Sequence, residues 1–236
     1  MKVAIHQPHY LPWLGYLAKW AEADLFVFLD TVQYEKNGWQ NRNRIKTAAG
    51  PQWLTVPVRA RLGTSIAEVA IDVDQPWARR HLRAIELAYG RAAGWARHAE
   101  SLRAFYAEPW RELVALAVAN ARWLASAVGI VTPSRLASEL QVAATDPTER
   151  LVEVCHAVGA TTYLAGRDGV EYMDLKRFQQ AGIEVRAQAY EHPVYPQLHG
   201  EFVPFLSGLD LLLASGVDAL AVVRGGDAWT SLAALP

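Results

Sequence analysis

Hydrophobic positions near the start of the chain switch between strand-like and helix-like spacing. Lys2–Ile5 is a short apolar, β-branched segment, and Leu25–Leu29 is a continuous apolar run. Between them, apolar residues recur at helical spacing, at Leu14, Leu17, Ala18 and Ala21. Continuous apolar strands alternating with helices are typical of a parallel sheet that is buried on both faces. The pattern therefore predicts an α/β fold with a mostly parallel sheet flanked by helices.

The rest of the chain continues this pattern around one interruption. Residues from about 76 to 128 carry apolar side chains at helical spacing and predict a helical insert. Elsewhere we expect strands at Trp53–Val58, Ala67–Val73, Thr161–Ala165, Ile183–Tyr190 and Ala219–Val223, and helices that begin at Asp146-Pro147, Asp174 and Phe202. No repeat or linker divides the chain, so residues 1–236 are expected to form a single domain.

Composition excludes several classes of protein. Lys and Arg number 23 against 24 Asp and Glu, so the chain lacks the basic field that binding to nucleic acid requires. No apolar run is long enough to span a membrane and no cleavable signal opens the sequence, which predicts a cytoplasmic protein. The single cysteine, Cys155, lies on the apolar side of a predicted helix and is expected to be a buried, structural thiol.

A polar loop follows the first predicted strand. It combines two histidines, a glutamine and a tyrosine with two prolines, at the place where parallel sheets hold their ligands. A histidine here suits a general base or a metal ligand. The alternative is a capped turn whose histidines bond to the backbone. The candidate residues are His6, Gln7, His9, Tyr10 and Trp13.

A second polar segment follows the next strand and is rich in amides and cations. Arg42 has the planar donor fork that suits a carboxylate or phosphate, and neighbouring amides could read sugar hydroxyls. The alternative is a solvated loop. The candidates are Asp30, Gln33, Lys36, Trp39, Asn41, Arg42, Asn43 and Lys46.

A third segment, 190–202, again combines polar side chains with prolines, and its candidates are His192, Tyr195 and Gln197. The alternative is a rigid surface connection. A divalent metal held by His6, His9 and Asp30, with His192 as a further ligand, is also open, although no spacing establishes it and we assign no metal site. The sequence contains no dinucleotide or P-loop fingerprint, which leaves the cofactor undetermined.

These segments carry a resemblance over nearly the whole chain. The sequence resembles the WbqC-like family, whose members occur among genes for O-antigen and other surface polysaccharides. The matching motifs are Gln7-Pro8, residues 10–16, Asp24–Asp30, residues 32–34, Trp39, residues 41–43, Ile45-Lys46, Trp53–Val58, Tyr163–Gly166, His192-Pro193, residues 195–197 and residues 202–207 with 210–212. This chain departs from the family at 213–215, where glycan-linked members often carry an aromatic residue and Asn.

A second, weaker likeness concerns the fold. The first strand, the His- and Pro-containing loop and the helix opening at Leu14 are similar to the start of nucleotidylyltransferases with an HxGH signature, which implies a Rossmann-like sheet. The corresponding tetrapeptide, Trp13–Tyr16, retains the glycine but lacks both histidines. That departure puts the nucleotidyl-transfer chemistry in doubt.

The family resemblance implies an activity on activated amino sugars, or a related group transfer in natural-product biosynthesis. We therefore hypothesise a transferase that forms an amide by moving an acyl, aminoacyl or glycyl group from a nucleotide-activated or acyl-activated donor to an amine of a small polar acceptor. His6 or His9 would act as the base and Asp30 would orient it, while Arg42, Asn41 and Asn43 would hold an anion. The alternatives are a non-catalytic nucleotide-sugar binding module and a degenerate nucleotidylyltransferase. The oligomeric state is left open.

Overall fold

A six-stranded sheet lies at the centre of the computed structural model, which describes residues 1–216 and 218–232, without the side chains of residues 168, 171 and 172. The strand order is β10-β9-β8-β1-β2-β7, with five strands parallel and β10 antiparallel to β9. The strands are β1 (Lys2–His6), β2 (Leu25–Phe28), β7 (Ser134–Leu136), β8 (Thr162–Ala165), β9 (Glu184–Gln188) and β10 (Trp229–Leu232). This arrangement confirms the predicted α/β, Rossmann-like fold.

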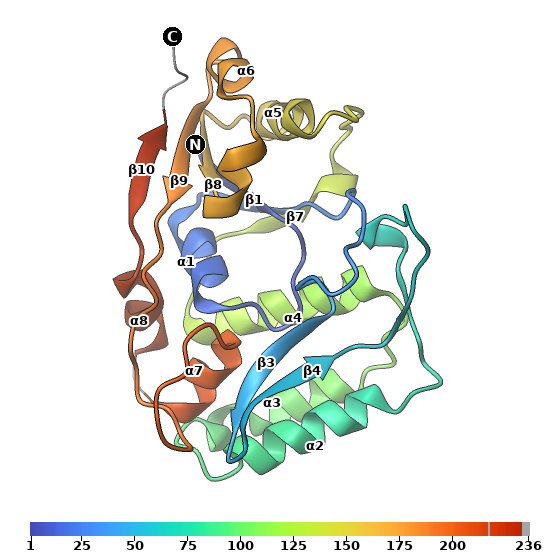
Figure 1. The fold of residues 1–236 in the computed structure, drawn as a ribbon, viewed down its shortest axis with the longest axis vertical. Coiled ribbons are helices and arrows are strands. Elements are labelled where there is room, and N and C mark those ends of the chain that lie inside the picture. The colour runs from blue at the N-terminus through green and yellow to red at the C-terminus, as the bar shows by residue number, and fades with distance from the viewer. Residues whose placement is uncertain (217, 233–236) are drawn as a thin grey trace.

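Helices cover both faces of the sheet (Figure 1). On one face, Ala4, Phe26 and Leu164 pack against α1 (Leu14–Glu22), α4 (Leu113–Val128), α7 (Gly208–Ala214) and α8 (Ala219–Gly225). On the other face, Val3, Val27 and Tyr163 pack against α5 (Pro147–Ala157) and α6 (Leu175–Gln180). Side chains alternate between the faces of a strand. His6 therefore shares the face of Ala4 and points toward α1.

A second apolar cluster lies beside the sheet. A hairpin of β3 (Arg42–Thr47) and β4 (Gly50–Thr55) packs through Ile45 and Leu54 against α2 (Trp77–Tyr89) and α3 (Trp95–Ala107). Figure 1 shows this hairpin at the opposite end of the molecule from α5 and α6. The remaining elements are β5 (Val58–Arg59), β6 (Ala70–Ile71) and the short 3₁₀ turns η1 (Ile66–Glu68), η2 (Ala137–Glu139) and η3 (Arg167–Tyr172). None of the helices in the described ranges is long and apolar enough to cross a bilayer.

Several sequence expectations for individual elements are wrong. Ala219–Val223 is not a strand but most of α8, because Asp218 caps a helix there by accepting the Ala221 amide at 3.1 Å. The helix expected from Phe202 begins only at Gly208, after the Ser207 cap. Ala67–Val73 forms the end of η1 and the two-residue strand β6. In contrast, the Asp146 cap of α5 is confirmed by its bond from the Glu149 amide at 2.9 Å.

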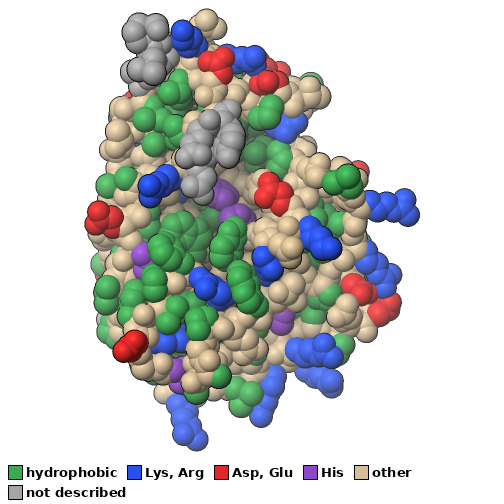
Figure 2. Space-filling model, viewed as in Figure 1, with side chains coloured by type: hydrophobic (Ala, Val, Ile, Leu, Met, Phe, Trp, Pro, Cys, Tyr) green, Lys and Arg blue, Asp and Glu red, His purple; other side chains and the backbone are tan. Residues whose placement is uncertain are grey.

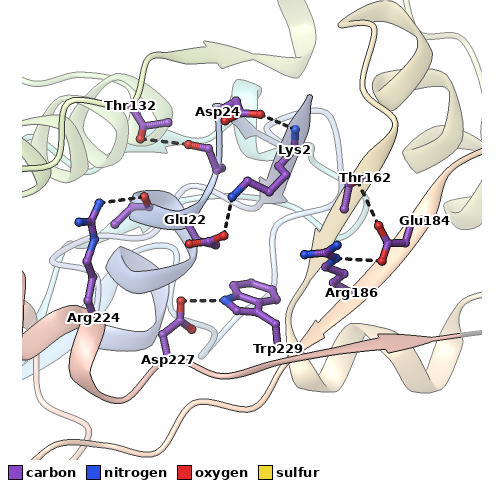
Figure 3. Close-up of polar contacts among 12 residues, drawn as sticks. Lys2, Glu22, Asp24, Thr132, Thr162, Glu184, Arg186, Arg224, Asp227 and Trp229 are labelled. Carbon is purple, nitrogen blue, oxygen red and sulfur yellow. Dashed lines mark hydrogen bonds and ion pairs between the residues drawn. The ribbon is translucent and has the colours of Figure 1, made fainter.

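Polar contacts fasten the start of the sheet and its last strand (Figure 3). The Lys2 amide donates to Asp24 at 2.7 Å and the Lys2 ammonium pairs with Glu22, which joins β1 to the end of α1. Trp229 donates its indole N–H to Asp227 at 2.9 Å. Gln188 donates to the same carboxylate at 3.0 Å and to the Gly15 carbonyl at 3.0 Å. The antiparallel edge strand is thereby tied to the amino end of α1.

A buried carboxylate joins the hairpin, α2 and α7. Asp210 accepts hydrogen bonds from the hydroxyls of Tyr89 at 2.6 Å and Tyr195 at 3.0 Å. Burial raises the pKa of Asp210, while these donors and the charge of Lys46 lower it. The Tyr89 hydroxyl also accepts the Lys46 amide at 2.9 Å. The Tyr89 hydroxyl on α2 therefore bonds to both strand β3 and helix α7.

We expect Tyr89→Phe to destabilise the fold by about 1 to 3 kcal/mol, because it removes a donor to a buried carboxylate and strands a backbone N–H. The measurement is the free energy of unfolding in urea. Tyr163→Phe is the matched control, since Tyr163 is also buried but its hydroxyl has no hydrogen bond among the described residues. An equal loss in both variants would contradict the role given to the Asp210 contact.

Candidate functional site

Two histidines and a tyrosine meet where β1 leaves the sheet. The His6 ring lies 4.6 Å from the His9 ring and 4.6 Å from the Tyr16 ring, and His9 stacks on Tyr16 at 5.1 Å. His6 comes from the end of β1, His9 from the following loop and Tyr16 from the first turn of α1. Histidine side chains reach the surface near the middle of one face, beside a group of hydrophobic side chains (Figure 2). We call His6, His9, Tyr16 and Lys19 the histidine cluster.

The protonation state of His6 follows from its surroundings. Its Nδ1 lies 3.2 Å from the Gln7 carbonyl oxygen, which can only accept a hydrogen bond, so the neutral ring carries its proton there. Burial lowers the pKa of His6 well below its usual value, and the charges of Lys19 and His9 lower it further. His6 is therefore neutral at pH 7, with the lone pair on Nε2.

His9 is more deeply enclosed. It is 6% exposed, and its buried Nδ1 has no hydrogen-bond partner among the described residues. Burial, followed by the charge of Lys19, lowers the pKa of His9 to about 3. Most buried polar atoms in proteins have a partner, so an orphaned ring nitrogen beside a second histidine is an unusual feature. We therefore keep His9 as a candidate ligand-binding residue.

Lys19 completes the cluster and was not among the predicted residues. It lies three residues after Tyr16 on the same side of α1 and is 2% exposed. Burial lowers its pKa to about 7. A Cβ built on Gly166, just after β8, would lie 3.5 Å from the Lys19 Nζ. The only feature of the sequence that points to Lys19 is its position about one helical turn after Tyr16.

The first and second predicted loops meet beside this cluster. Gln40 donates from Nε2 to the Gln7 Oε1 at 2.6 Å, and the Tyr10 amide donates to the Trp39 carbonyl at 3.3 Å. Tyr16 donates its hydroxyl to the Gln7 carbonyl at 3.2 Å. Gln7 is thus held by its side chain and its backbone.

The third loop adds an aromatic wall. Trp13 lies 5.5 Å from the Tyr190 ring and 5.8 Å from the Phe205 ring, and His192 lies 5.2 Å from Phe205. A Cβ on Gly15 would fall 2.3 Å from the Trp13 indole, so this position must lack a side chain for the indole to lie there. The His192 Nδ1 contacts the Pro193 carbonyl at 3.0 Å, and its buried Nε2 has no partner.

The predicted cations lie mainly on the hairpin. The Arg42 guanidinium stacks on the Trp53 ring at 4.5 Å and donates to Asn37, and Trp39 lies 5.6 Å from Trp53. Arg44 donates to the Phe205 carbonyl at 3.3 Å, which joins the hairpin to the aromatic wall. Two further predicted residues of this segment, Gln33 and Lys36, are exposed.

The structure does not bring several other candidates to the histidines, because their polar atoms hold the chain together. Asp30 accepts from the Ser138 amide at 3.0 Å and hydroxyl at 2.6 Å and has no contact with a described histidine. The rest bind within the protein: Asn41 to the Val56 carbonyl, Asn43 to the Leu11 carbonyl, Lys46 to the Gly200 and Glu201 carbonyls, Tyr10 to His81 and Tyr106, Tyr195 to Asp210, and Gln197 to Val203.

Two further observations bear on the choice of site. Among the side chains that the structure describes, no three of His, Cys, Asp or Glu gather as metal ligands. A cavity of about 770 Å³ lies between the β3–β4 turn and α2, with Arg79, Arg80 and Arg83 on its wall. None of the predicted site residues lines that cavity. Buried atoms without a described partner occur at His9 but also at Gln40, Asn41, Arg42, Arg44 and His192. We take the histidine cluster as the candidate site, because two neutral histidines and a buried lysine meet there at the carboxyl edge of the sheet.

Comparison with known proteins places the chain in a family. The sequence profile of the WbqC-like protein family matches residues 7–222. The chain belongs to this family. It is 40% identical over 230 residues to the uncharacterized protein Rv1507c of Mycobacterium tuberculosis, covering 94% of this chain and 97% of that protein. No solved structure matches it. The candidate residues of this WbqC-like chain from Gln7 onward lie inside the matched region and His6 immediately precedes it, and the relative's name states no activity.

The buried histidines should make the protein sensitive to acid. In the unfolded chain His9 protonates below about pH 6.5, while in the folded chain it stays neutral down to about pH 3. The free energy of unfolding therefore falls as the pH drops through this window, by about 2 kcal/mol from His9 alone at pH 5. Urea unfolding at pH 7 and pH 5 measures this loss, and His9→Asn should reduce it. An unchanged pH dependence in His9→Asn would contradict the burial of a neutral ring.

Proposed function

We propose that this WbqC-like protein is a transferase that moves an acyl, aminoacyl or glycyl group to an amine of a small polar acceptor. The observation that carries the proposal is the state of His6. Its proton is held on Nδ1 by the Gln7 carbonyl, and its Nε2 has no hydrogen bond among the described residues. A neutral imidazole with a free lone pair, partly exposed at the carboxyl edge of a parallel sheet, suits a general base.

In the proposed step, the acceptor nitrogen attacks the carbonyl carbon of the activated donor and a C–N bond forms. The bond from that carbon to the leaving group breaks, and its electron pair departs with the leaving group. The proton lost from nitrogen passes to the His6 Nε2. His9 and Tyr16 hold the His6 ring between them, which fixes the direction of the lone pair.

The surrounding residues support a small polar acceptor. Trp13 and the exposed Trp39 offer flat faces on which a sugar or other ring can stack. Arg42 stacks on Trp53, the neighbour of Trp39, where it can meet an anionic group. In this proposal Asp30 holds the Ser138 loop rather than orienting a histidine, because Ser138 occupies both of its oxygens.

The test is amide formation. The protein is incubated with nucleotide-activated amino sugars or free amino acids as acceptors and with acyl-CoA thioesters or acyl phosphates as donors, and products are detected by mass spectrometry. For a pair that turns over, His6→Ala should lower kcat by about 10²- to 10⁴-fold. Acceptor affinity, measured by calorimetry, should stay nearly unchanged. His156→Ala, an exposed histidine on α5, is the matched control and should keep full activity.

Two outcomes would overturn the proposal. Full turnover by both His6→Ala and His9→Ala would show that neither histidine acts as the base. Saturable binding of a nucleotide sugar without product from any pair would instead favour a non-catalytic binding module.

A further inference from the structure

Two nitrogens of the histidine cluster have no hydrogen bond to any described residue. The His9 Nδ1 is a fully buried atom without such a partner. The Lys19 side chain is 2% exposed, and none of the hydrogen bonds among the described residues involves its Nζ. Leaving such groups unsatisfied costs free energy, which a ligand could recover by accepting their hydrogen bonds.

The charges around these nitrogens favour an anion. The charge of Lys19 acts on both His6 and His9, and the Tyr16 ring stacks on His9. In the part of the chain that the structure describes, no carboxylate pairs with either nitrogen, and Asp30 is bound by Ser138. Every side chain that could carry a charge in this cluster at neutral pH would carry a positive one. A bound cation would be repelled, whereas an anion would be attracted.

The end of β8 borders the ammonium group. Gly166 follows β8 at the same edge of the sheet as His6, and a Cβ there would lie 3.5 Å from the Lys19 Nζ, an ordinary van der Waals distance. Lys19 approaches from α1 and His9 from the loop before it, so the two donors come from different segments.

We propose that Lys19 and His9 form an oxyanion site that holds a phosphate group of the donor, beside the base His6. The inference rests on the proposed function and deepens it: the donor would be activated through phosphate, as in an acyl phosphate or a nucleotide-linked donor. Lys19 donates from its ammonium and His9 from Nδ1, and both stabilise the charge that grows on the leaving phosphate oxygens.

Sulfate is the probe, because it keeps its charge between pH 6 and pH 9 and any pH dependence then belongs to the protein. Calorimetry on the wild-type protein should show sulfate binding that is strongest near pH 6. Burial lowers the pKa of Lys19 to about 7, so affinity should fall about tenfold for each pH unit above that value as the ammonium loses its proton. Acetate should bind at least tenfold more weakly than sulfate.

Lys19→Met should weaken sulfate binding at pH 6 at least tenfold and abolish its pH dependence. It should leave the fold intact or more stable, because it removes a buried ammonium. Lys176→Met removes the same charge from an exposed position on α6 and should bind sulfate as the wild type does. His9→Asn is the second variant, and it should weaken binding while the pH dependence due to Lys19 remains.

Wild-type affinity in Lys19→Met, or sulfate binding that does not change between pH 6 and pH 9, would overturn the oxyanion site. Tighter binding of acetate than of sulfate would show a carboxylate site and overturn the phosphate assignment. The sulfate measurements do not depend on turnover, so the oxyanion site and the proposed function can be contradicted independently. Turnover that depends on His6 without sulfate binding would overturn only this inference, and sulfate binding without any product would overturn only the proposed function.

Discussion

Parallel pairing of β1 with β2 and β8 is the constraint on which the rest of the molecule depends. Parallel strands need crossover connections, and the helices in those connections cover both faces of the sheet. All the carboxyl ends then lie along one edge. The end of β1 and the glycine after β8 are far apart in the sequence, yet this topology makes His6 and Gly166 neighbours of the same helix, α1. The site is a consequence of the sheet.

Burial of three nitrogen bases in one place determines the electrostatics of that edge. A charged group that leaves water without a partner loses its proton rather than bear the full desolvation cost. His6 and His9 therefore stay neutral, and Lys19 titrates near neutral pH. The surrounding apolar core stabilises the fold enough to hold these groups in an unfavourable setting. The same setting supplies both a free lone pair and unsatisfied donors, which are the two requirements of the proposed chemistry.

The sequence predicted the fold where hydrophobic spacing was strong and failed where it was short or mixed. Leu25–Leu29 and the capped helix after Asp146 were found because their signals are continuous or specific. Arg42–Thr47 looked like a polar loop, since charged residues occupy the outer positions of this hairpin strand. Ala219–Val223 is too short an apolar run for its spacing to distinguish strand from helix. Lys19 was missed because a lysine on a helix ordinarily faces water.

Residue type alone could not distinguish side chains that bind a ligand from side chains that stabilise the loops by hydrogen bonds, because both roles need polar atoms. Loops at a sheet edge must satisfy their own backbone groups, and Asn43, Gln197 and Asp30 do so for Leu11, Val203 and Ser138. The density of amides after β2 is therefore largely structural. Buried atoms without a described partner occur in both places: the His9 Nδ1 in the histidine cluster, and the Gln40 Oε1, Asn41 Oδ1 and Arg42 Nε in the amide-rich segment. The histidine cluster is favoured because it brings two neutral imidazoles and a buried lysine together, a juxtaposition that only the folded chain reveals.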